Sequence, residues 1–295
     1  MQYSTLIIGH ICRDKNTDHL GVTEYRAGGA ALYSSAAAYA VGGNAAVLTK
    51  TAPADADLLT EFTLPADRVI NLPSGSTTRM ENTYFTPDRE KRKSVCAAQG
   101  DPFTPDELPA GLEAAIYHLA GLVYGDYADG MIPFLAQRGS VAVDVQGFLR
   151  HVDRENGGAM YFADWADKEK LLPCIRYLKT DAAEAEILTG TTDRAAAARQ
   201  LHAWGAEEVL ITHNTEALLY ADGEVLTCPL KPRSLIGRTG RGDTTFAVYL
   251  NERLTRPAAD ALRFAAAAVS LKMETPGPFN GTRADVEAYI DAFYK

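Results

Sequence analysis

Short apolar runs alternate with longer amphipathic or alanine-rich stretches along most of this chain. We expect strands at Thr5–Gly9, Ala45–Thr49, Ile116–Leu119, Val141–Val145, Ile175–Leu178 and Val209–Thr212. We expect helices at Ala30–Val41, Met131–Gln137, Lys168–Leu172, Ala182–Leu188, Ala195–Trp204, Thr244–Leu254, Ala259–Met273 and Ala284–Phe293. Strands that are apolar nearly throughout and alternate with helices predict a parallel sheet covered on both faces.

One region departs from this alternation. Ser76–Phe85 alternates partly, Pro87–Glu90 is turn-like, and Lys91–Ala97 is extended in style, which together predict a β-hairpin. Ile11–Tyr25 also lacks helical periodicity. The two segments are consistent either with a small separate sheet that projects from the main domain or with an edge hairpin of the main sheet.

Length and charge limit the class of protein. The 295 residues suffice for one large α/β domain or two small ones, and 46% hydrophobic residues permit a sizeable core. The net charge of −9 argues against a nucleic-acid partner, because such proteins usually carry a basic patch. An acidic enzyme can still bind phosphate locally through arginine, lysine, helix ends or Mg²⁺.

The cysteines and the N-terminus indicate a cytoplasmic protein. Cys12, Cys96, Cys174 and Cys228 are far apart and form no C-x-x-C pair, so reduced thiols are expected rather than a zinc site or a disulfide framework. Met1–His10 lacks the features of a signal peptide, and no apolar run approaches the length of a membrane span. We therefore expect no membrane association.

The segment Gly240-Arg241-Gly242-Asp243 opens a predicted helix and has the composition of a phosphate site. Glycines before a helix let the backbone turn tightly, and the first helical turn presents unpaired N–H groups and the positive end of its dipole. Asp243 at this position is consistent with an ordinary N-cap. It is also where a general base would lie if those N–H groups held a phosphoryl group.

Three segments together resemble the PfkB (ribokinase-like) family of carbohydrate kinases. Thr239–Thr244 resembles the family's T-G-A-G-D segment, and Gly28-Gly29 before a helix resembles its di-glycine signature. Lys179–Glu184, followed by Leu188-Thr189-Gly190, resembles its N-x-x-E segment and the L-T-G after it. The resemblance implies a single ribokinase-like domain over residues 1–295. Its fold would be a three-layer α/β/α sandwich with a mostly parallel central sheet and a small β lid, formed here from about 11–25 and 76–98.

The resemblance also implies roles for individual residues. Asp243 would be the catalytic base, and the backbone N–H groups of Gly240, Arg241, Gly242 and Asp243 would form the anion hole. Asp14, Gly28 and Gly29 would contact the substrate, and Glu184 with Asp181 would help hold Mg²⁺ through water. The positions that would bind the nucleotide are Thr212, Asn214, Arg238 and Thr239.

Several residues depart from the family pattern. Gly237 and Arg238 stand where the family usually has Asp-Thr, and Arg241 replaces the alanine between the glycines. Tyr33 replaces a substrate-contacting asparagine. Asp181 replaces the asparagine of N-x-x-E, and Asn214 replaces the glycine of a V-T-x-G segment. These departures indicate an outlying subgroup and leave the acceptor, and also the nucleotide, open.

The leading functional hypothesis is a Mg²⁺-requiring kinase that transfers the γ-phosphoryl group of ATP to a hydroxyl of a sugar or other small polyol. The alternatives are a nucleoside kinase, a kinase of a cyclic polyol of the inositol type, or a non-catalytic sensor on the same fold. We also consider a homodimer formed through the β lid. A dehydrogenase is disfavoured, because no G-x-G-x-x-G follows the first strand.

Overall fold

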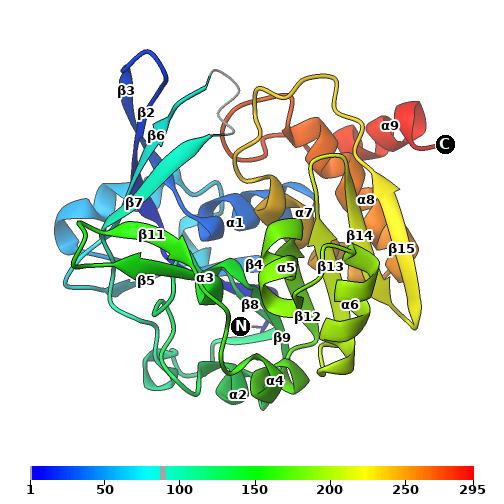
Figure 1. Cartoon of the computed structure of the whole chain (residues 1–295), viewed down its shortest axis with the longest axis horizontal. Helices are drawn as coiled ribbons and strands as arrows, with labels where there is room; N and C mark the ends of the chain where they lie inside the picture. Colours follow the sequence, from blue (N-terminus) through cyan, green and yellow to red (C-terminus); the bar gives the residue numbers. More distant parts are fainter. Residues whose placement is uncertain (1, 87–90) are drawn as a thin grey trace.

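The computed structural model describes residues 2–86 and 91–295, and its centre is a large twisted sheet (Figure 1). The strands of this sheet are β1 (Gln2–Ile8), β4 (Ala45–Thr51), β5 (Val69–Pro73), β8 (Glu113–Leu119), β9 (Ser140–Asp144), β12 (Tyr177–Asp181), β13 (Glu208–Thr212), β14 (Glu216–Ala221) and β15 (Glu224–Pro229). Among the described residues they are ordered β15-β14-β13-β12-β9-β8-β1-β4-β5.

Most neighbouring strands of the central sheet are parallel, as the sequence pattern predicted. The exceptions among the described strands are β14 and β15, which form antiparallel hairpins after β13. Neither these two strands nor β5 was predicted. The parallel strands from β5 to β13 run in one direction, so their carboxyl ends meet along one edge of the sheet.

Helices cover both faces of the central sheet, which confirms the predicted α/β/α sandwich. One face is covered by α1 (Ala30–Ala40), α7 (Arg241–Arg253) and α8 (Ala258–Lys272), with α9 (Arg283–Phe293) against α8. The opposite face is covered by α2 (Met131–Ala136), α5 (Ala182–Thr189) and α6 (Arg194–Ala203). Shorter helical segments are α3 (Gln146–Leu149), α4 (Lys168–Leu171), η1 (Pro53–Glu61), η2 (Ala66–Arg68), η3 (Pro105–Glu107) and η4 (Leu172–Cys174).

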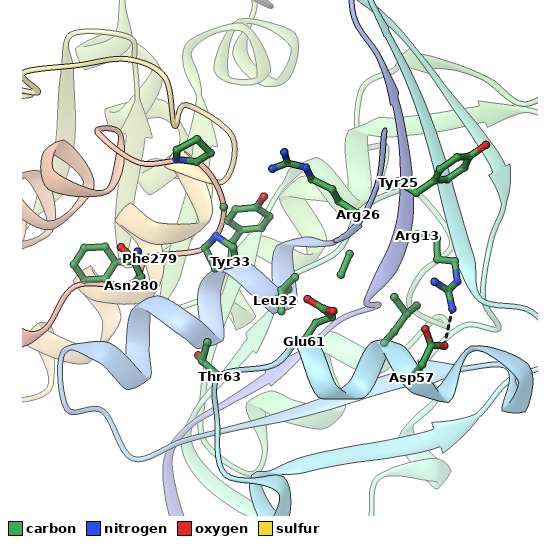
Figure 2. A pocket seen from close by; sticks show the side chains of 15 residues that line it. Arg13, Tyr25, Arg26, Leu32, Tyr33, Asp57, Glu61, Thr63, Phe279 and Asn280 are labelled. Carbon is green, nitrogen blue, oxygen red and sulfur yellow. Dashed lines mark hydrogen bonds and ion pairs between the residues drawn. The ribbon is translucent and has the colours of Figure 1, made fainter. Parts of the chain in front are cut away.

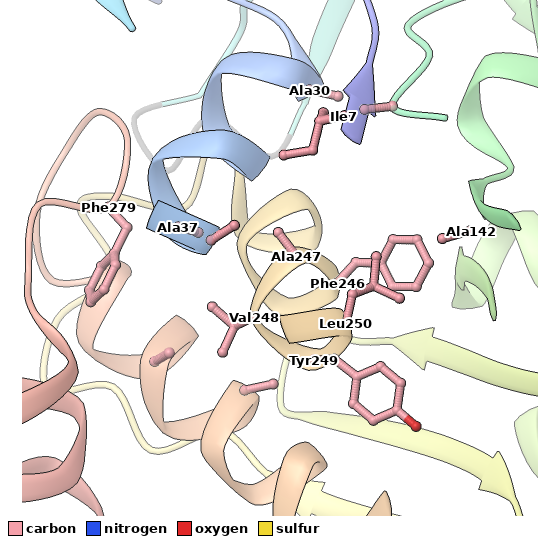
Figure 3. Close-up of a cluster of buried hydrophobic side chains, with 14 of the residues drawn as sticks. Ile7, Ala30, Ala37, Ala142, Phe246, Ala247, Val248, Tyr249, Leu250 and Phe279 are labelled. Atoms are coloured by element: carbon pink, nitrogen blue, oxygen red, sulfur yellow. The ribbon is translucent and has the colours of Figure 1, made fainter. Parts of the chain in front are cut away.

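The core on the α7 side fixes the helix that carries Asp243. Ile7 of β1 packs on this side, whereas its neighbours Leu6 and Ile8 pack on the other face, as strand alternation requires. Figure 3 shows Phe246 of α7 directed toward Ala142 of the sheet and Val248 directed away from the sheet. Phe246 lies one turn after Asp243 and is 1% exposed, so the start of α7 is anchored by buried apolar contact.

A second sheet is separate from the central one and forms the lid. It contains β2 (Cys12–Thr17), β3 (Thr23–Gly28), β6 (Thr78–Tyr84) and β7 (Arg92–Ala98), the segments that the sequence placed there. It also contains β10 (Arg150–Asp153) and β11 (Ala159–Phe162), which were not predicted. The predicted turn Pro87–Glu90 lies outside the described residues. Figure 1 shows the β2–β3 hairpin projecting from the body of the molecule.

The described residues contain no helix with both the length and the apolar composition that a membrane crossing requires.

Candidate active site

A cavity of about 1000 Å³ lies where the lid sheet meets the carboxyl edge of the central sheet. This is the edge where open α/β sheets usually bind ligands. All the residues predicted to form the site line this cavity except Gly28. They are Asp14, Gly29, Asp181, Glu184, Thr212, Asn214, Arg238, Thr239, Gly240, Arg241, Gly242 and Asp243.

The N-terminus of α7 faces this cavity. Gly240 precedes the helix with φ +77°, a left-handed conformation that glycine adopts without strain. The first helical hydrogen bond of α7 runs from the N–H of Thr244 to the carbonyl of Gly240, at 2.9 Å. The N–H groups of Gly242 and Asp243 precede this bond and suit an anion. The N–H of Arg241 instead donates to the carbonyl of Arg238 at 3.2 Å, so the turn already engages one of the predicted anion-hole donors.

A buried lysine lies beneath the start of α7. Lys179, in the middle of β12, and Asp144, the last residue of β9, are register partners on adjacent parallel strands, and their ion pair measures 2.9 Å. Both side chains are almost fully buried. A Cβ built on Gly242 would lie 3.0 Å from Lys179 Nζ, so the glycine lets the helix start close to the ammonium group.

The pKa of Asp243 is raised, first because the carboxyl group is removed from water and then because of the negative charge of Asp144. Lys179, Arg150 and Lys272 oppose this rise through their positive charges. A carboxyl group with a raised pKa binds a proton more readily than an ordinary aspartate. A raised pKa and a place in the cavity are properties that a general base needs.

A second lysine holds the loop before α7. The Lys272 ammonium group, at the end of α8, is fully buried and donates to the carbonyl of Gly237 at 2.6 Å and to that of Thr239. Because a trans peptide directs its C=O and N–H in opposite directions, the N–H of Gly240 points away from Lys272. Burial lowers the pKa of Lys272 to about 8.

The two carboxylates proposed for Mg²⁺ form a capping box at the start of α5. Asp181 accepts from the N–H of Glu184 at 2.8 Å, and Glu184 accepts from the N–H of Asp181 at 2.8 Å. Burial raises the pKa of Glu184, and the nearby Lys179 partly offsets that rise. Among the described residues, no group of three His, Cys, Asp or Glu side chains could hold a metal ion. Both carboxylates line the cavity, and a Mg²⁺ ion with so few protein ligands would need water and phosphate oxygens to complete its shell.

Two arginines of the cavity lining meet at Asn214, which follows β13. Arg238 and Arg241 both donate to Oδ1 of Asn214, at 3.1 and 2.9 Å. Leu235 and Ile236, which also line the cavity, are 52% and 70% exposed. This part of the cavity therefore combines positive charge with open apolar surface.

The lid supplies the other wall of the cavity. Asp14 lines it from β2, and burial raises the pKa of this carboxyl group to about 6. Asn82 and Arg92 of the lid also line the cavity. Arg79 does not, because its guanidinium group pairs with Asp55 on the other face of the lid, at 3.3 Å.

Gly28 and Gly29 differ in what they make room for. A Cβ on Gly28 would lie 2.2 Å from Oδ2 of Asp14, so this glycine makes space for the carboxylate. Gly29 has φ +110°, and a Cβ there would lie 2.4 Å from the carbonyl oxygen of His10. Gly29 therefore serves the turn before α1, whereas Gly28 serves a side chain in the cavity.

Tyr33 separates this cavity from a second one. The second cavity, of about 700 Å³, lies beside η1 and the loop 276–280, and Figure 2 shows Tyr33 and Arg26 in its lining. A Cβ on Gly240 would lie 2.0 Å from the Tyr33 ring, so the ring packs directly on the loop before α7. The large residue at this position therefore forms a wall where the family pattern has an asparagine.

Lys179, Asp144, Arg150 and Lys272 are site residues that the sequence did not reveal. Each is a charged side chain in or beside an apolar strand or helix, and a lysine after an apolar helical run resembles an ordinary helix end. The sequence feature that could have identified them is a charged residue in or next to a segment that the apolar pattern predicted to be buried. Lys179 itself lies within the segment Lys179–Glu184 that carried the family resemblance.

Comparisons with known proteins agree with this architecture. The pfkB family carbohydrate kinase pattern matches residues 149–284. A solved pyrophosphate-dependent kinase in the ribokinase family, complexed with a pyrophosphate analog and myo-inositol, is 33% identical. It matches with a TM-score of 0.85 over 96% of this chain and 99% of its own. The Arabidopsis thaliana ribokinase complexed with ribose and ATP is 17% identical, with a TM-score of 0.77 over 98% and 99% of the two chains, and that likeness concerns the fold.

A curated relative matches over a shorter stretch. A cytidine kinase of Thermococcus kodakarensis is 40% identical over 70 residues, which are 23% of this chain and 25% of that enzyme. The full-length likeness to the pyrophosphate-dependent kinase, together with the family match, is sufficient for assignment. The chain belongs to the PfkB (ribokinase-like) family of carbohydrate kinases, enzymes that phosphorylate an alcohol group.

Proposed function

We propose that this protein transfers a phosphoryl group from a phosphoanhydride donor to a hydroxyl of a small polyol, with Asp243 as the general base. The observation that carries this proposal is the position of Asp243. It lies at the N-terminus of α7, beside a buried ammonium group and within the cavity that Asp14 lines from the lid. A base, an anion site and a hydroxyl-binding carboxylate are the groups that such a reaction needs.

In the proposed reaction, Asp14 binds acceptor hydroxyls as a hydrogen-bond acceptor. Asp243 takes the proton of one hydroxyl while that oxygen forms a bond to the terminal phosphorus of the donor. The anhydride P–O bond breaks, and the electron pair leaves with the remaining phosphate group. The N–H groups of Gly242 and Asp243 stabilise the negative charge on the transferred group, and Lys179 adds positive charge beneath them.

Mg²⁺ is part of the proposal. Glu184 and Asp181 would hold it through water, with the carboxylate oxygens that the capping box leaves available. When bound, the ion would neutralise charge on the donor phosphates.

A cyclic polyol of the inositol type is the acceptor we favour. A full-length relative at 33% identity is described as complexed with myo-inositol. The cavity fits a ligand with several hydroxyls, because Asp14, Asn82 and Arg92 give it both acceptors and donors. A nucleoside is the alternative acceptor, in line with the shorter match to a cytidine kinase. A non-catalytic sensor is disfavoured, because a sensor needs no base with a raised pKa.

We propose pyrophosphate as the donor, and ATP, predicted from the sequence, as the alternative. Arg238 and Arg241 meet at Asn214, and we place the donor at this end of the cavity, which we call the donor end. Two arginines suit a small polyanion, because such a donor must gain its affinity from phosphate contacts. The 33%-identical relative is described as pyrophosphate-dependent. The argument for ATP is the exposed apolar surface of Leu235 and Ile236, on which a nucleotide base could pack.

We also propose a cytoplasmic homodimer formed through the lid. β3 is an edge strand of the lid sheet, and near it Leu20, Val22 and Tyr25 are 75%, 63% and 75% exposed. An exposed edge with apolar side chains favours pairing with another chain. The four cysteines are free thiols, which suits a reducing compartment, and cell fractionation would test that location.

Replacing the base should abolish turnover while leaving the fold intact. We expect Asp243→Asn to lower kcat by about 10²–10⁴-fold. In the wild type, kcat should fall with decreasing pH well above the ordinary aspartate pKa of about 3.9, because the raised pKa protonates the base there. Steady-state kinetics from pH 5 to 9 measure both effects. The control is Asp193→Asn, at the start of α6, and equal rates in both variants would refute the assignment.

Removing the charge of Glu184 should weaken the response to Mg²⁺. We expect Glu184→Gln to raise the Mg²⁺ concentration for half-maximal rate by about tenfold or more, as the loss of an outer partner of a metal typically does. Glu186→Gln, at an exposed position of the same helix, serves as the control. An unchanged Mg²⁺ dependence in Glu184→Gln would remove this residue from the metal site.

Substitution of Arg238 and Arg241 tests whether the phosphoryl donor is pyrophosphate or ATP. If pyrophosphate is the donor, Arg238→Ala and Arg241→Ala should each raise its KM by about tenfold or more, since a hydrogen bond to a charged group contributes about 1.5–3 kcal/mol. Initial rates with pyrophosphate and with ATP, for the wild type and both variants, measure this. Arg199→Ala, exposed on α6, is the control. Wild-type KM values in both variants would mean that the backbone N–H groups suffice, and turnover with ATP alone would overturn the choice of donor.

Sedimentation velocity tests the dimer. We expect a dimer for the wild type and a monomer for Leu20→Lys or Tyr25→Lys, because a charge at the apolar edge opposes its burial. Leu254→Lys, at a 40% exposed position at the end of α7, should leave the dimer unchanged. A monomeric wild type at micromolar concentration contradicts the proposal.

A further inference from the structure

A cysteine contacts the carboxylate that we assign to the acceptor. Cys12 and Asp14 are two residues apart on β2, so their side chains share one face of the strand. The Cys12 thiol donates to Oδ1 of Asp14, with an Sγ–Oδ1 distance of 2.9 Å. Cys12 is 1% exposed, and both residues line the main cavity.

The opposite strand leaves a space for the same carboxylate. Gly28 of β3 is the register partner of Cys12. A Cβ on Gly28 would lie 2.2 Å from Oδ2 and 2.5 Å from Cγ of Asp14, so any larger residue would displace the carboxylate. The Asp14 side chain is therefore held between the thiol on its own strand and a glycine on the next one.

The other groups near Asp14 act differently on it. Arg26 of β3 is its register partner, and its guanidinium group pairs with Glu24 at 2.8 Å. Arg92 of β7 acts on Asp14 through its charge. Tyr33 of α1 is close enough for the Asp14 charge to raise the tyrosine pKa. On the β6 side, the register partner is the apolar Met80.

We propose that Cys12 is a positioning residue, which orients the Asp14 carboxylate for acceptor binding and stabilises its charged form. This inference rests on the proposed role of Asp14 in the acceptor site. The thiol engages Oδ1, while Oδ2 and the remaining lone pair of Oδ1 stay available to acceptor hydroxyls. A thiol is a weak donor, so it fixes the carboxylate without competing strongly with those hydroxyls.

The direct test follows the titration of Asp14 without any ligand. Burial raises the pKa of this carboxyl group to about 6, and the Cys12 hydrogen bond opposes that rise. Carbon-13 NMR of the Asp14 carboxyl should therefore show a higher pKa in Cys12→Ala, and Cys12→Ser, which keeps a donor, should restore the wild-type value. Cys96→Ala is the matched control. It removes the other lid thiol that is 1% exposed, which donates to the carbonyl of Ala98 and not to Asp14.

Kinetics give the second readout, with myo-inositol, ribose and cytidine as acceptor probes. Cys12→Ala should raise the acceptor KM by about five- to tenfold. We expect kcat and the donor KM to stay within about twofold, since the thiol acts on the acceptor through Asp14. Cys12→Ser should recover the acceptor KM, and Cys96→Ala should not change it. In the Asp14→Asn background, Cys12→Ala should have no further effect.

The outcomes separate this inference from the proposed function. If Asp14→Asn leaves the acceptor KM unchanged, Asp14 does not bind the acceptor and that part of the proposed function fails, whatever the NMR result. If Asp14→Asn raises the KM but Cys12→Ala changes neither the KM nor the Asp14 pKa, only the inference fails. A loss of stability to urea in both Cys12→Ala and Cys12→Ser, without a shift in the Asp14 pKa, would also overturn it and leave Cys12 a packing residue.

Discussion

The buried ion pair between Lys179 and Asp144 is the interaction on which the rest of the site depends. A buried ammonium group without a partner is strongly destabilising, and Asp144 compensates it from the neighbouring strand. Because the two residues are register partners on adjacent parallel strands, the sheet itself fixes their separation. The positive charge that results acts on Asp243 and Glu184, two further carboxylates in the same region.

The Lys179 charge partly offsets the effect of burial on the pKa of the neighbouring carboxyl groups. Removal from water favours the neutral form of Asp243 and of Glu184, and the negative charge of Asp144 adds to that effect. Lys179 opposes it, and the N-terminal end of α7 has the polarity to do the same. The pKa of Asp243 is therefore raised by less than burial alone would raise it, which suits the role of base that we propose for this residue.

A helix or strand was predictable from the sequence where its apolar residues followed a single regular spacing. Continuous apolar strands such as β13 and the alanine-rich α1 satisfy this condition, and the motif residues from Gly240 to Asp243 follow a recognisable local order. β10 and β11 do not, because they are four residues each and β11 is held to the lid by pairing with the distant β7. Lys179 and Lys272 could not be assigned either. Their partners lie 35 residues away in the sequence, at Asp144 and at Gly237, and such pairing depends on topology.

The two ends of the cavity are held by different kinds of contact. The donor end depends on long-range packing, since Lys272 reaches the loop before α7 from another helix and the Tyr33 ring lies on Gly240 from α1. Asp14, the carboxylate that we propose for the acceptor, depends on neighbours within two adjacent lid strands, a thiol two residues away and a glycine across the ladder. A substitution at the donor end therefore disturbs several elements together, whereas one in the lid can alter the position of Asp14 and leave the base and the anion site in place. In this arrangement, a change around Asp14 can alter the proposed acceptor site while the groups proposed for phosphoryl transfer stay unchanged.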